Sequence, residues 1–405
     1  MALFVTKKTF LVLRRIGLAL IMCASLTACG SLTTTDLNAD DLVAAHQLPV
    51  RDLKTEVDSL VAPLAETKHT PGVVAGVLLP DGTMHFYGYG VANRENGRAP
   101  NGDTLFAVGS LSKGFLGAET ALLVDKGVLS WNDTLPELLP PNTPLSSDAQ
   151  KITLLQLTTH TSGLPRQPLT LETLSYFVRY LFTGESFYNH FDRDYVFNYL
   201  ADFEADNTGK SQYSNIGYGL LGYILERRTG KTVDQLLAQK IVRPLKLKCT
   251  GYTQEELPCY PERAHGYAGD QPKFIPRGEP TPDWHFTHLM RGSAALYSNA
   301  KDLLTFAAAH VKGHKSRLNA VMANDLKVRV PQDKASAAIA WVVDDVDGQP
   351  IDYQIGIVAG FTSYIGIDPE HKTAVVILQN SFNWDSSVGH KLLLRLRNWQ
   401  TVKNR

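Results

Sequence analysis

The chain has 405 residues, with 40 Lys or Arg and 40 Asp or Glu. Four of the basic residues and none of the acidic ones lie in the first 28 positions, so the rest of the chain carries 36 basic and 40 acidic residues, a net charge of about −4. This balance argues against a nucleic-acid partner, because nucleic-acid-binding domains are usually basic.

The N-terminus has the pattern of an export signal. Basic residues precede an apolar run over residues 16–26, which is too short to span a bilayer comfortably. Leu26-Thr27-Ala28-Cys29 resembles the lipobox of bacterial lipoproteins, so residues 1–28 are predicted to be a lipoprotein signal peptide and Cys29 to carry the lipid. An ordinary cleaved signal and a short uncleaved anchor helix are the alternatives.

The predicted lipid places the mature protein in the cell envelope, anchored to a membrane and facing the periplasm or the cell exterior. Residues 29–50 are rich in Ser, Thr, Asp and Asn and have little apolar periodicity, which predicts a tether. The folded domain is therefore expected to cover residues 51–405.

This domain begins and ends with recognisable elements. Helical spacing over residues 51–67 is followed by two strands around the turn Pro80-Asp81-Gly82, at 73–79 and 83–91. The C-terminal part has strand patterns and a closing amphipathic helix, at residues 337–343, 351–356, 362–367, 373–379 and 388–399. The segment between the two ends is mostly helical in pattern, for example at residues 115–126, 171–182 and 216–229.

The simplest arrangement of these elements is an α+β fold. An antiparallel sheet is built from both ends of the chain, terminal helices cover it, and a mostly helical lobe is inserted. We predict an α/β lobe from residues 51–109 and 316–405 and a helical lobe from residues 110–315. A cleft between two such lobes is a usual place for a catalytic site.

The most informative motif is Ser110-Leu111-Ser112-Lys113, which opens a predicted helix. Positions three apart lie on one face of a helix, so the Lys113 amine can reach the Ser110 hydroxyl and accept its proton. The N-terminus of the helix also provides unpaired backbone N–H groups that favour developing negative charge. A lone Ser-x-x-Lys is a weak pattern, which also occurs where a serine caps a helix and a lysine is solvated.

Two further elements add weight to this motif. Tyr213-Ser214-Asn215 opens another helix and supplies a phenol and an amide, and Gln354-Ile355-Gly356 lies on a predicted strand. In this order the three elements resemble those of the penicillin-recognising serine hydrolases, and within them the class C β-lactamase-like branch that includes periplasmic DD-peptidases and esterases. The resemblance covers nearly the whole chain from about residue 55, in the stretches FAVGSLSK, VDKGVLSWNDTL, ITLLQLTTHTSGLP, YSNIGYGLLGYILE, IVRPLKL, GSAALYSNAKDL and GFTSYIGIDP.

The resemblance implies a β-lactamase/transpeptidase-like fold and a set of roles. Ser110 is expected to be the nucleophile, Lys113 its base, Tyr213 a second proton carrier and Asn215 a donor to the acyl amide of the substrate. The backbone N–H groups of Ser110 and Ile357 would form the oxyanion hole. The alternatives are a buried core role for the tyrosine and a helix-cap role for the asparagine.

The third element departs from the family pattern. Where this chain has Gln354, followed by Ile355-Gly356, the family usually has Lys or often His, whose cation helps to bind a substrate carboxylate. Glutamine donates hydrogen bonds but carries no charge. Recognition of a substrate carboxylate is therefore in doubt unless another basic residue enters the site.

Other residues have weaker patterns. His160, in Thr159-His160-Thr161, suggests a triad, but no orienting partner is evident and a structural turn is favoured. The aromatic and charged segment 176–202 is expected to line the mouth of the cleft, with a solvated helical face as the alternative. Neither a metal nor a cofactor is predicted, because the sequence has no HExxH or P-loop motif. The sequence also lacks a GxSxG motif, so an α/β-hydrolase nucleophile elbow is unsupported.

Two of the four cysteines, Cys249 and Cys259, lie in the predicted folded domain. In an oxidising compartment we expect them to form a disulfide that closes a short loop, although two reduced cysteines are the alternative.

The sequence thus predicts a serine hydrolase that forms an acyl-enzyme with D-amino-acid-containing peptides or esters of the cell envelope. A D-alanyl or short-chain esterase and a catalytically weak penicillin-binding lipoprotein are the alternatives. The expected partners are a small-molecule or cell-wall substrate and a membrane, and the oligomeric state stays open.

Overall fold

The computed structural model describes residues 52–66, 70–205, 210–312, 316–333, 335–346, 348–383, 387–397 and 399. The predicted signal peptide, the lipid-bearing Cys29 and the tether over residues 29–50 lie outside these ranges. None of the helices in the described ranges combines the length and the apolar character needed to cross a membrane.

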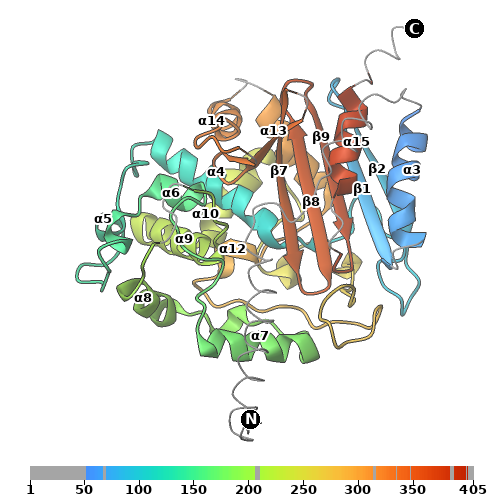
Figure 1. The fold of residues 1–405 in the computed structure, drawn as a ribbon. Helices are drawn as coiled ribbons and strands as arrows, with labels where there is room; N and C mark the ends of the chain where they lie inside the picture. Colours follow the sequence, from blue (N-terminus) through green and yellow to red (C-terminus); the bar gives the residue numbers. More distant parts are fainter. Residues whose placement is uncertain are drawn as a thin grey trace, which may run out of the picture.

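A seven-stranded antiparallel sheet forms the centre of the α/β part (Figure 1). Its strand order is β2-β1-β9-β8-β7-β6-β5, so the N-terminal hairpin pairs with the last strand of the chain, with Val73 opposite Gln379. The strands are β1 (Gly72–Leu78), β2 (Met84–Gly90), β5 (Ser336–Ala337), β6 (Val342–Val346), β7 (Gln349–Val358), β8 (Phe361–Asp368) and β9 (Thr373–Gln379). The predicted α+β arrangement with a sheet built from both chain ends is confirmed.

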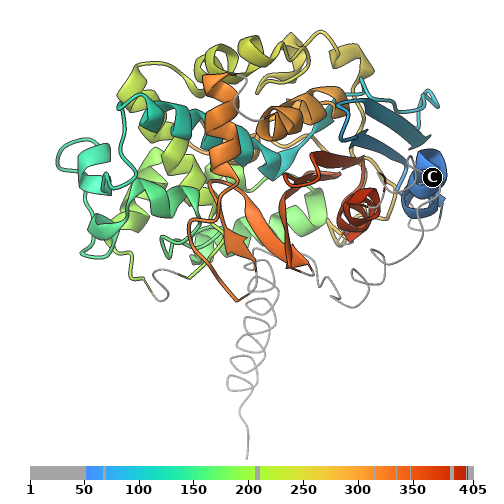
Figure 2. The ribbon, with the colours of Figure 1, turned by 90° about the horizontal axis from the view of Figure 1, so that it is seen from above.

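Helices cover both faces of the sheet, and this explains why β1 is buried at every position. Val73, Ala75 and Val77 pack with the terminal helices α3 (Leu53–Glu66) and α15 (Ser387–Arg397). The alternate residues of β1, which point the other way, pack with α13 (Ala300–Val311) in the larger core. Figure 2 shows α3 in blue and α15 in red on one side of the sheet and α13 in orange on the other.

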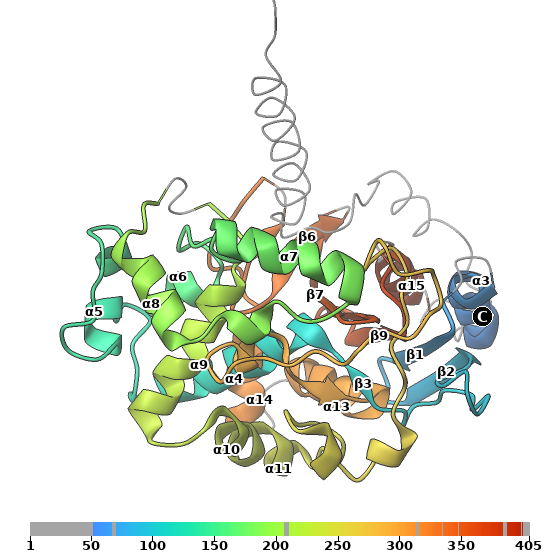
Figure 3. The same ribbon diagram turned by 90° about the horizontal axis from the view of Figure 1, so that it is seen from below.

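The remaining helices lie mainly in the central part of the chain. Figure 3 shows one of them, α7, in green, on the side of the molecule that faces the viewer. They are α4 (Ser112–Asp125), α5 (Leu135–Leu138), α6 (Leu154–Thr158), α7 (Leu171–Thr183), α8 (Arg193–Ala201), α9 (Asn215–Thr229), α10 (Val233–Leu237), α11 (Arg243–Leu245), α12 (Arg291–Ala294) and α14 (Arg317–Asp325). Helix α13 belongs to the segment predicted as the helical lobe, yet it packs on the sheet. The lobe boundaries at residues 109 and 316 stay predictions.

One predicted strand is wrong. The pattern over residues 337–343 indicated a single strand, whereas the structure has two short ones, β5 and β6, with a turn between them. Ala340 in this turn has a φ of 65°, and the N–H of Ala338 donates to the carbonyl of Trp341. The apolar residues of the turn are buried, so their hydrophobicity does not distinguish a turn from a strand.

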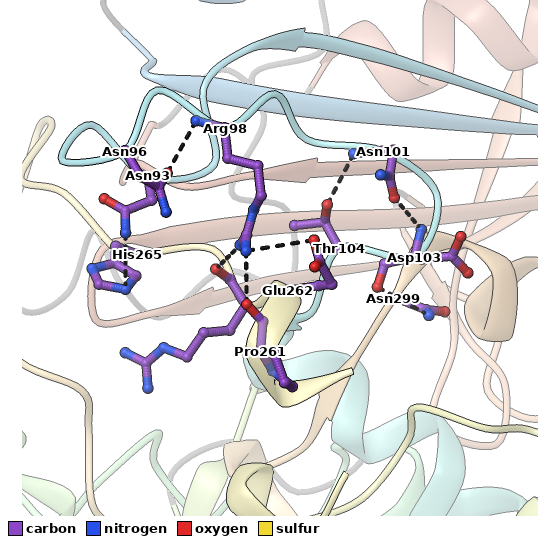
Figure 4. Close-up of polar contacts among 11 residues, drawn as sticks. Asn93, Asn96, Arg98, Asn101, Asp103, Thr104, Pro261, Glu262, His265 and Asn299 are labelled. Atoms are coloured by element: carbon purple, nitrogen blue, oxygen red, sulfur yellow. Dashed lines mark hydrogen bonds and ion pairs between the residues drawn. The ribbon is translucent and has the colours of Figure 1, made fainter. Parts of the chain in front are cut away.

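A polar network fixes the segment between β2 and the central helices (Figure 4). The Arg98 guanidinium donates to the carbonyls of Pro261 and Arg263 at 2.7 and 2.6 Å and pairs with Glu262 at 3.4 Å. Farther along the segment, the N–H of Leu105 donates to the carbonyl of Glu262. These contacts tie the residues that lead toward Ser110 to a distant part of the chain.

The disulfide between Cys249 and Cys259 supports the same segment. Both cysteines are buried in a small apolar cluster with Leu105, which precedes the two-residue strand β3 (Phe106–Ala107). β3 pairs with β4 (Tyr297–Ser298). The disulfide therefore packs against Leu105, in the segment that leads into the Ser110 turn.

We expect the double variant Cys249→Ser/Cys259→Ser to be less stable than the wild type by about 3 kcal/mol at most, because the disulfide closes a short loop. Urea denaturation would measure the free energy of unfolding, and mass spectrometry of a non-reduced digest would check the bond in the exported wild type. Two free thiols in freshly isolated protein, or an unchanged unfolding midpoint, would contradict this expectation.

Candidate active site

Ser110 lies in a tight turn between β3 and α4. Gly109 adopts a φ of +53°, a conformation that glycine tolerates best, and a short 3₁₀ turn over Gly109–Leu111 leads into α4. The Ser112 hydroxyl donates to the carbonyl of Gly109 at 2.6 Å and so holds the turn closed. Helix α4 is buried from Ser112 to Leu123, so Ser110 sits at the end of a core helix.

The Lys113 amine contacts the Ser110 hydroxyl. Its Nζ donates to Ser110 Oγ at 3.0 Å and to the carbonyl of Ser293 at 2.6 Å, and the lysine is only 2% exposed. Burial lowers the pKa of Lys113 well below its usual range, and the nearby Arg166 cation lowers this pKa further. The amine is therefore neutral far more readily than that of a solvated lysine, and a neutral amine can accept a proton.

Tyr213 provides a second polar group at Ser110. Its ring lies 4.8 Å from Lys113 Nζ, measured to the ring centre. Burial raises the pKa of the Tyr213 hydroxyl, while the Arg166 cation and the neighbouring Ser110 side chain act in the opposite direction. The three predicted catalytic side chains thus lie together.

The turn that contains His160 holds Tyr213 in place. The His160 ring stacks on the Tyr213 ring with centres 4.4 Å apart, and its Nδ1 accepts the backbone N–H of Ser214 at 3.0 Å. The Ser214 hydroxyl donates to the carbonyl of Pro165, and the N–H of Gly217 donates to this hydroxyl at the N-cap of α9. Burial lowers the pKa of His160 well below its usual range, so the ring is neutral. This geometry supports the structural interpretation of His160.

The backbone of strand β7 packs directly against the backbone of the Ser110 turn. A Cβ atom at Gly356 would lie 2.1 Å from the carbonyl oxygen of Val108, and one at Gly109 would lie 3.0 Å from the Ile357 nitrogen. The Ser363 hydroxyl on β8 also donates to the Val108 carbonyl, at 2.8 Å. The predicted oxyanion-hole residues Ser110 and Ile357 therefore belong to two segments that touch.

Gln354 and Asn215 both line the same pocket as Ser110. Gln354 Nε2 donates to the carbonyl of Ala340 at 2.8 Å, and its Oε1 is buried without a hydrogen-bond partner. Asn215 Nδ2 donates to the Tyr188 hydroxyl at 2.5 Å, and its Oδ1 is likewise buried and unpaired. Each of these two pocket-lining amides therefore has an oxygen without a hydrogen-bond partner among the described residues.

Sequence reasoning missed several residues of this pocket. Arg166 follows the turn that contains His160, and its guanidinium carbon lies 4.5 Å from the centre of the Tyr213 ring. A single arginine in a loop has no pattern that would have identified it. The segment 176–202 contributes aromatic rings, as predicted, and Trp284 joins them from a distant loop; these rings are Phe177, Tyr180, Phe187, Tyr188 and Trp284.

No group of three or more His, Cys, Asp or Glu side chains suited to a metal ion occurs in the described residues. The chemistry that these residues themselves offer is proton transfer between a hydroxyl, an amine and a phenol, beside two backbone N–H donors.

Comparison with known proteins agrees with this geometry. A family model described as Beta-lactamase matches residues 57–397. A beta-lactamase of Yersinia enterocolitica is 25% identical over 348 residues, which cover 83% of this chain and 80% of that protein. The D-alanyl-D-alanine-carboxypeptidase/endopeptidase AmpH of Escherichia coli (strain K12) is 30% identical over 189 residues, 46% of each protein.

The fold is also similar to that of solved structures. The crystal structure of a class C beta lactamase from Rhodobacter sphaeroides has a TM-score of 0.70 at 24% identity, covering 86% of this chain and 99% of that one. Fold and relatives together define a serine hydrolase. The chain belongs to the beta-lactamase family.

We expect Gly356→Ala to reduce activity on 4-nitrophenyl acetate by on the order of a hundredfold, because the added Cβ would push β7 away from the Ser110 turn. Such overpacking should also cost about 1–3 kcal/mol of stability, measured by urea denaturation. Gly222→Ala in α9 is the control, since its Cβ would meet nothing closer than 3.4 Å. Equal activity in the two variants would show that the approach of β7 is not required.

Proposed function

We propose that this protein hydrolyses D-amino-acid-containing peptides or esters of the cell envelope through an acyl-Ser110 intermediate. The observation that carries the proposal is the buried contact of 3.0 Å between Lys113 Nζ and Ser110 Oγ, in a place where the pKa of the amine is strongly lowered. A serine hydroxyl needs a base within hydrogen-bond reach to become a nucleophile, and this amine meets that requirement.

In the proposed acylation, Lys113 takes the proton of the Ser110 hydroxyl as Oγ attacks the substrate carbonyl carbon. The carbonyl oxygen gains negative charge, which the N–H groups of Ser110 and Ile357 stabilise. Tyr213, protonated because burial raises its pKa, donates its proton to the leaving atom as the bond to the carbonyl carbon breaks. The proton held by Lys113 then restores the tyrosine hydroxyl.

Deacylation uses the same base with water as the nucleophile. Water attacks the acyl carbon, its proton passes to the neutral Lys113 amine, and Lys113 passes this proton to Ser110 Oγ as the bond between Oγ and the acyl carbon breaks. Asn215 lines the pocket and has an unpaired amide oxygen, which supports its role in holding the amide of an acyl group. Gly356 contributes by having no side chain between β7 and the turn.

The names of the relatives support the substrate class. They include beta-lactamases and a D-alanyl-D-alanine-carboxypeptidase/endopeptidase, which act on an amide or a peptide bond. The neutral Gln354 favours the second candidate, a D-alanyl or short-chain esterase, because no cation stands at that position to hold a carboxylate beside the scissile bond. A catalytically weak penicillin-binding lipoprotein is the third candidate, and the intact Ser110–Lys113 contact argues against it.

We expect Ser110→Ala to lower the hydrolysis of 4-nitrophenyl acetate by on the order of a thousandfold or more and to abolish labelling by a fluorescent penicillin on a gel. Ser175→Ala, at an exposed position of α7, is the control and should retain both signals. Hydrolysis that survives Ser110→Ala would refute the nucleophile. Labelling without any hydrolysis in the wild type would favour the binding lipoprotein.

We also propose that Cys29 carries lipid and anchors the protein in the cell envelope, which the lipobox and the following polar segment support. Cys29→Ser should move the protein from the membrane to the soluble fraction after cell fractionation. The control is Cys23→Ser, which changes a cysteine within the predicted signal peptide and should leave the distribution unchanged. Membrane association that persists in Cys29→Ser would contradict the lipid anchor.

A further inference from the structure

Arg166 is a cation in the pocket without a partner anion. Within the described part of the chain its side chain forms no ion pair or hydrogen bond, and its Nε is buried and unpaired. The contact that the structure gives its guanidinium is the face of the Tyr213 ring, 4.5 Å away. Arg166 is half-buried, and an unpaired buried N–H of a charged group is costly unless an opposite charge or hydrogen bonds compensate, so this guanidinium is suited to bind an anion.

Arg166 has no acidic neighbour among the described residues of the pocket. Of the residues that the structure describes, Lys113 and Arg166 line the pocket, and no Asp or Glu does. The Arg166 cation acts on the pKa of Lys113, His160 and Tyr213, whereas no carboxylate acts on any of the three. A substrate carboxylate that enters this pocket would therefore meet attraction without competition from an acidic side chain.

The position of Arg166 determines which part of a substrate it can reach. The backbone N–H of Asn215 donates to the Arg166 carbonyl at 3.0 Å, so Arg166 lies on the side of the pocket formed by the start of α9. Gln354 and Ile357, by contrast, belong to β7. In the proposed function Asn215 holds the acyl amide, so a group near Arg166 belongs to the acyl part of the substrate.

We propose that Arg166 binds a carboxylate carried by the acyl part of the substrate, and that the leaving group is uncharged at the corresponding β7 position. This inference rests on the proposed function for its assignment of the acyl side. The planar guanidinium can form two parallel hydrogen bonds with a carboxylate. The substrate class is thus an acidic acyl donor. Its free carboxylate lies on the acyl side of the scissile bond, for example on an acidic side chain or at the end of a dicarboxylic acyl group.

The test uses two chromogenic esters that differ by one charge, N-succinylglycine 4-nitrophenyl ester and its succinyl methyl ester. The wild type should prefer the acid, and Arg166→Gln should reduce kcat/KM for the acid by about tenfold to hundredfold more than for the methyl ester. Arg166→Lys should keep part of the preference. Arg193→Gln, at an exposed position of α8, is the matched control and should change neither rate.

Comparing the two succinylglycine esters separates binding of the carboxylate by Arg166 from an effect of Arg166 on the pKa of Lys113. Loss of the Arg166 charge would raise the pKa of the lysine and change both rates by the same factor. An equal fall for the two esters would therefore overturn the proposal. A third ester, N-acetylglycine 3-carboxyphenyl ester, carries its carboxylate on the leaving group; a larger effect of Arg166→Gln on this ester would also overturn it.

A binding measurement keeps the inference independent of turnover. Calorimetry on the Ser110→Ala protein would compare N-succinylglycine amide with its methyl ester. Tighter binding of the acid, lost in Ser110→Ala/Arg166→Gln, supports the proposal, and equal binding of both ligands overturns it. If the wild type cleaves neither ester, the hydrolase proposal fails, and the calorimetric preference alone decides on Arg166.

Discussion

The close approach of strand β7 to the Ser110 turn is the constraint on which the site depends. The two segments come together only because Gly109 and Gly356 have no side chains at the point of contact. Strand β7 lies inside the sheet, and the turn opens the core helix α4, so neither partner moves freely. The backbone N–H groups of Ser110 and Ile357 are thereby held by a buried helix and an interior strand, and such fixed positions favour the stabilisation of charge without reorganisation.

Burial and charge then determine the chemistry of the side chains. Lys113 is removed from water and has the Arg166 cation as its charged neighbour. These conditions favour the neutral amine, whereas an acidic neighbour would favour the ammonium form. Among the described residues no Asp or Glu lines the pocket, and this absence supports the neutral form of the proposed base. The Arg166 cation also makes the pocket receptive to an acidic acyl group.

The sequence predicted the parts of this arrangement that follow from local spacing. Ser110 and Lys113 are one helical turn apart, and the strand at 373–379 has an apolar pattern that coincides with β9. It failed where tertiary contacts decide, as at residues 337–343, where Ala340 makes a buried turn and supplies the carbonyl that binds Gln354. Arg166 was not predicted for the same reason, because its contact with the Tyr213 ring and its place in the pocket arise only when the chain folds.

The pairing of β1 with β9 has a consequence for how the molecule is made. Val73 of β1 pairs with Gln379 of β9, and Glu56 of α3 forms a buried ion pair with Arg395 of α15. The first elements of the domain therefore pack against the last ones. During synthesis the edge of β1 that pairs with β9 stays unpaired until nearly all of the chain has left the ribosome. A chain truncated before residue 373 would expose that edge permanently. Late completion of the sheet suits the proposed export of this chain, because a polypeptide that has not yet folded can cross a membrane and fold on the far side.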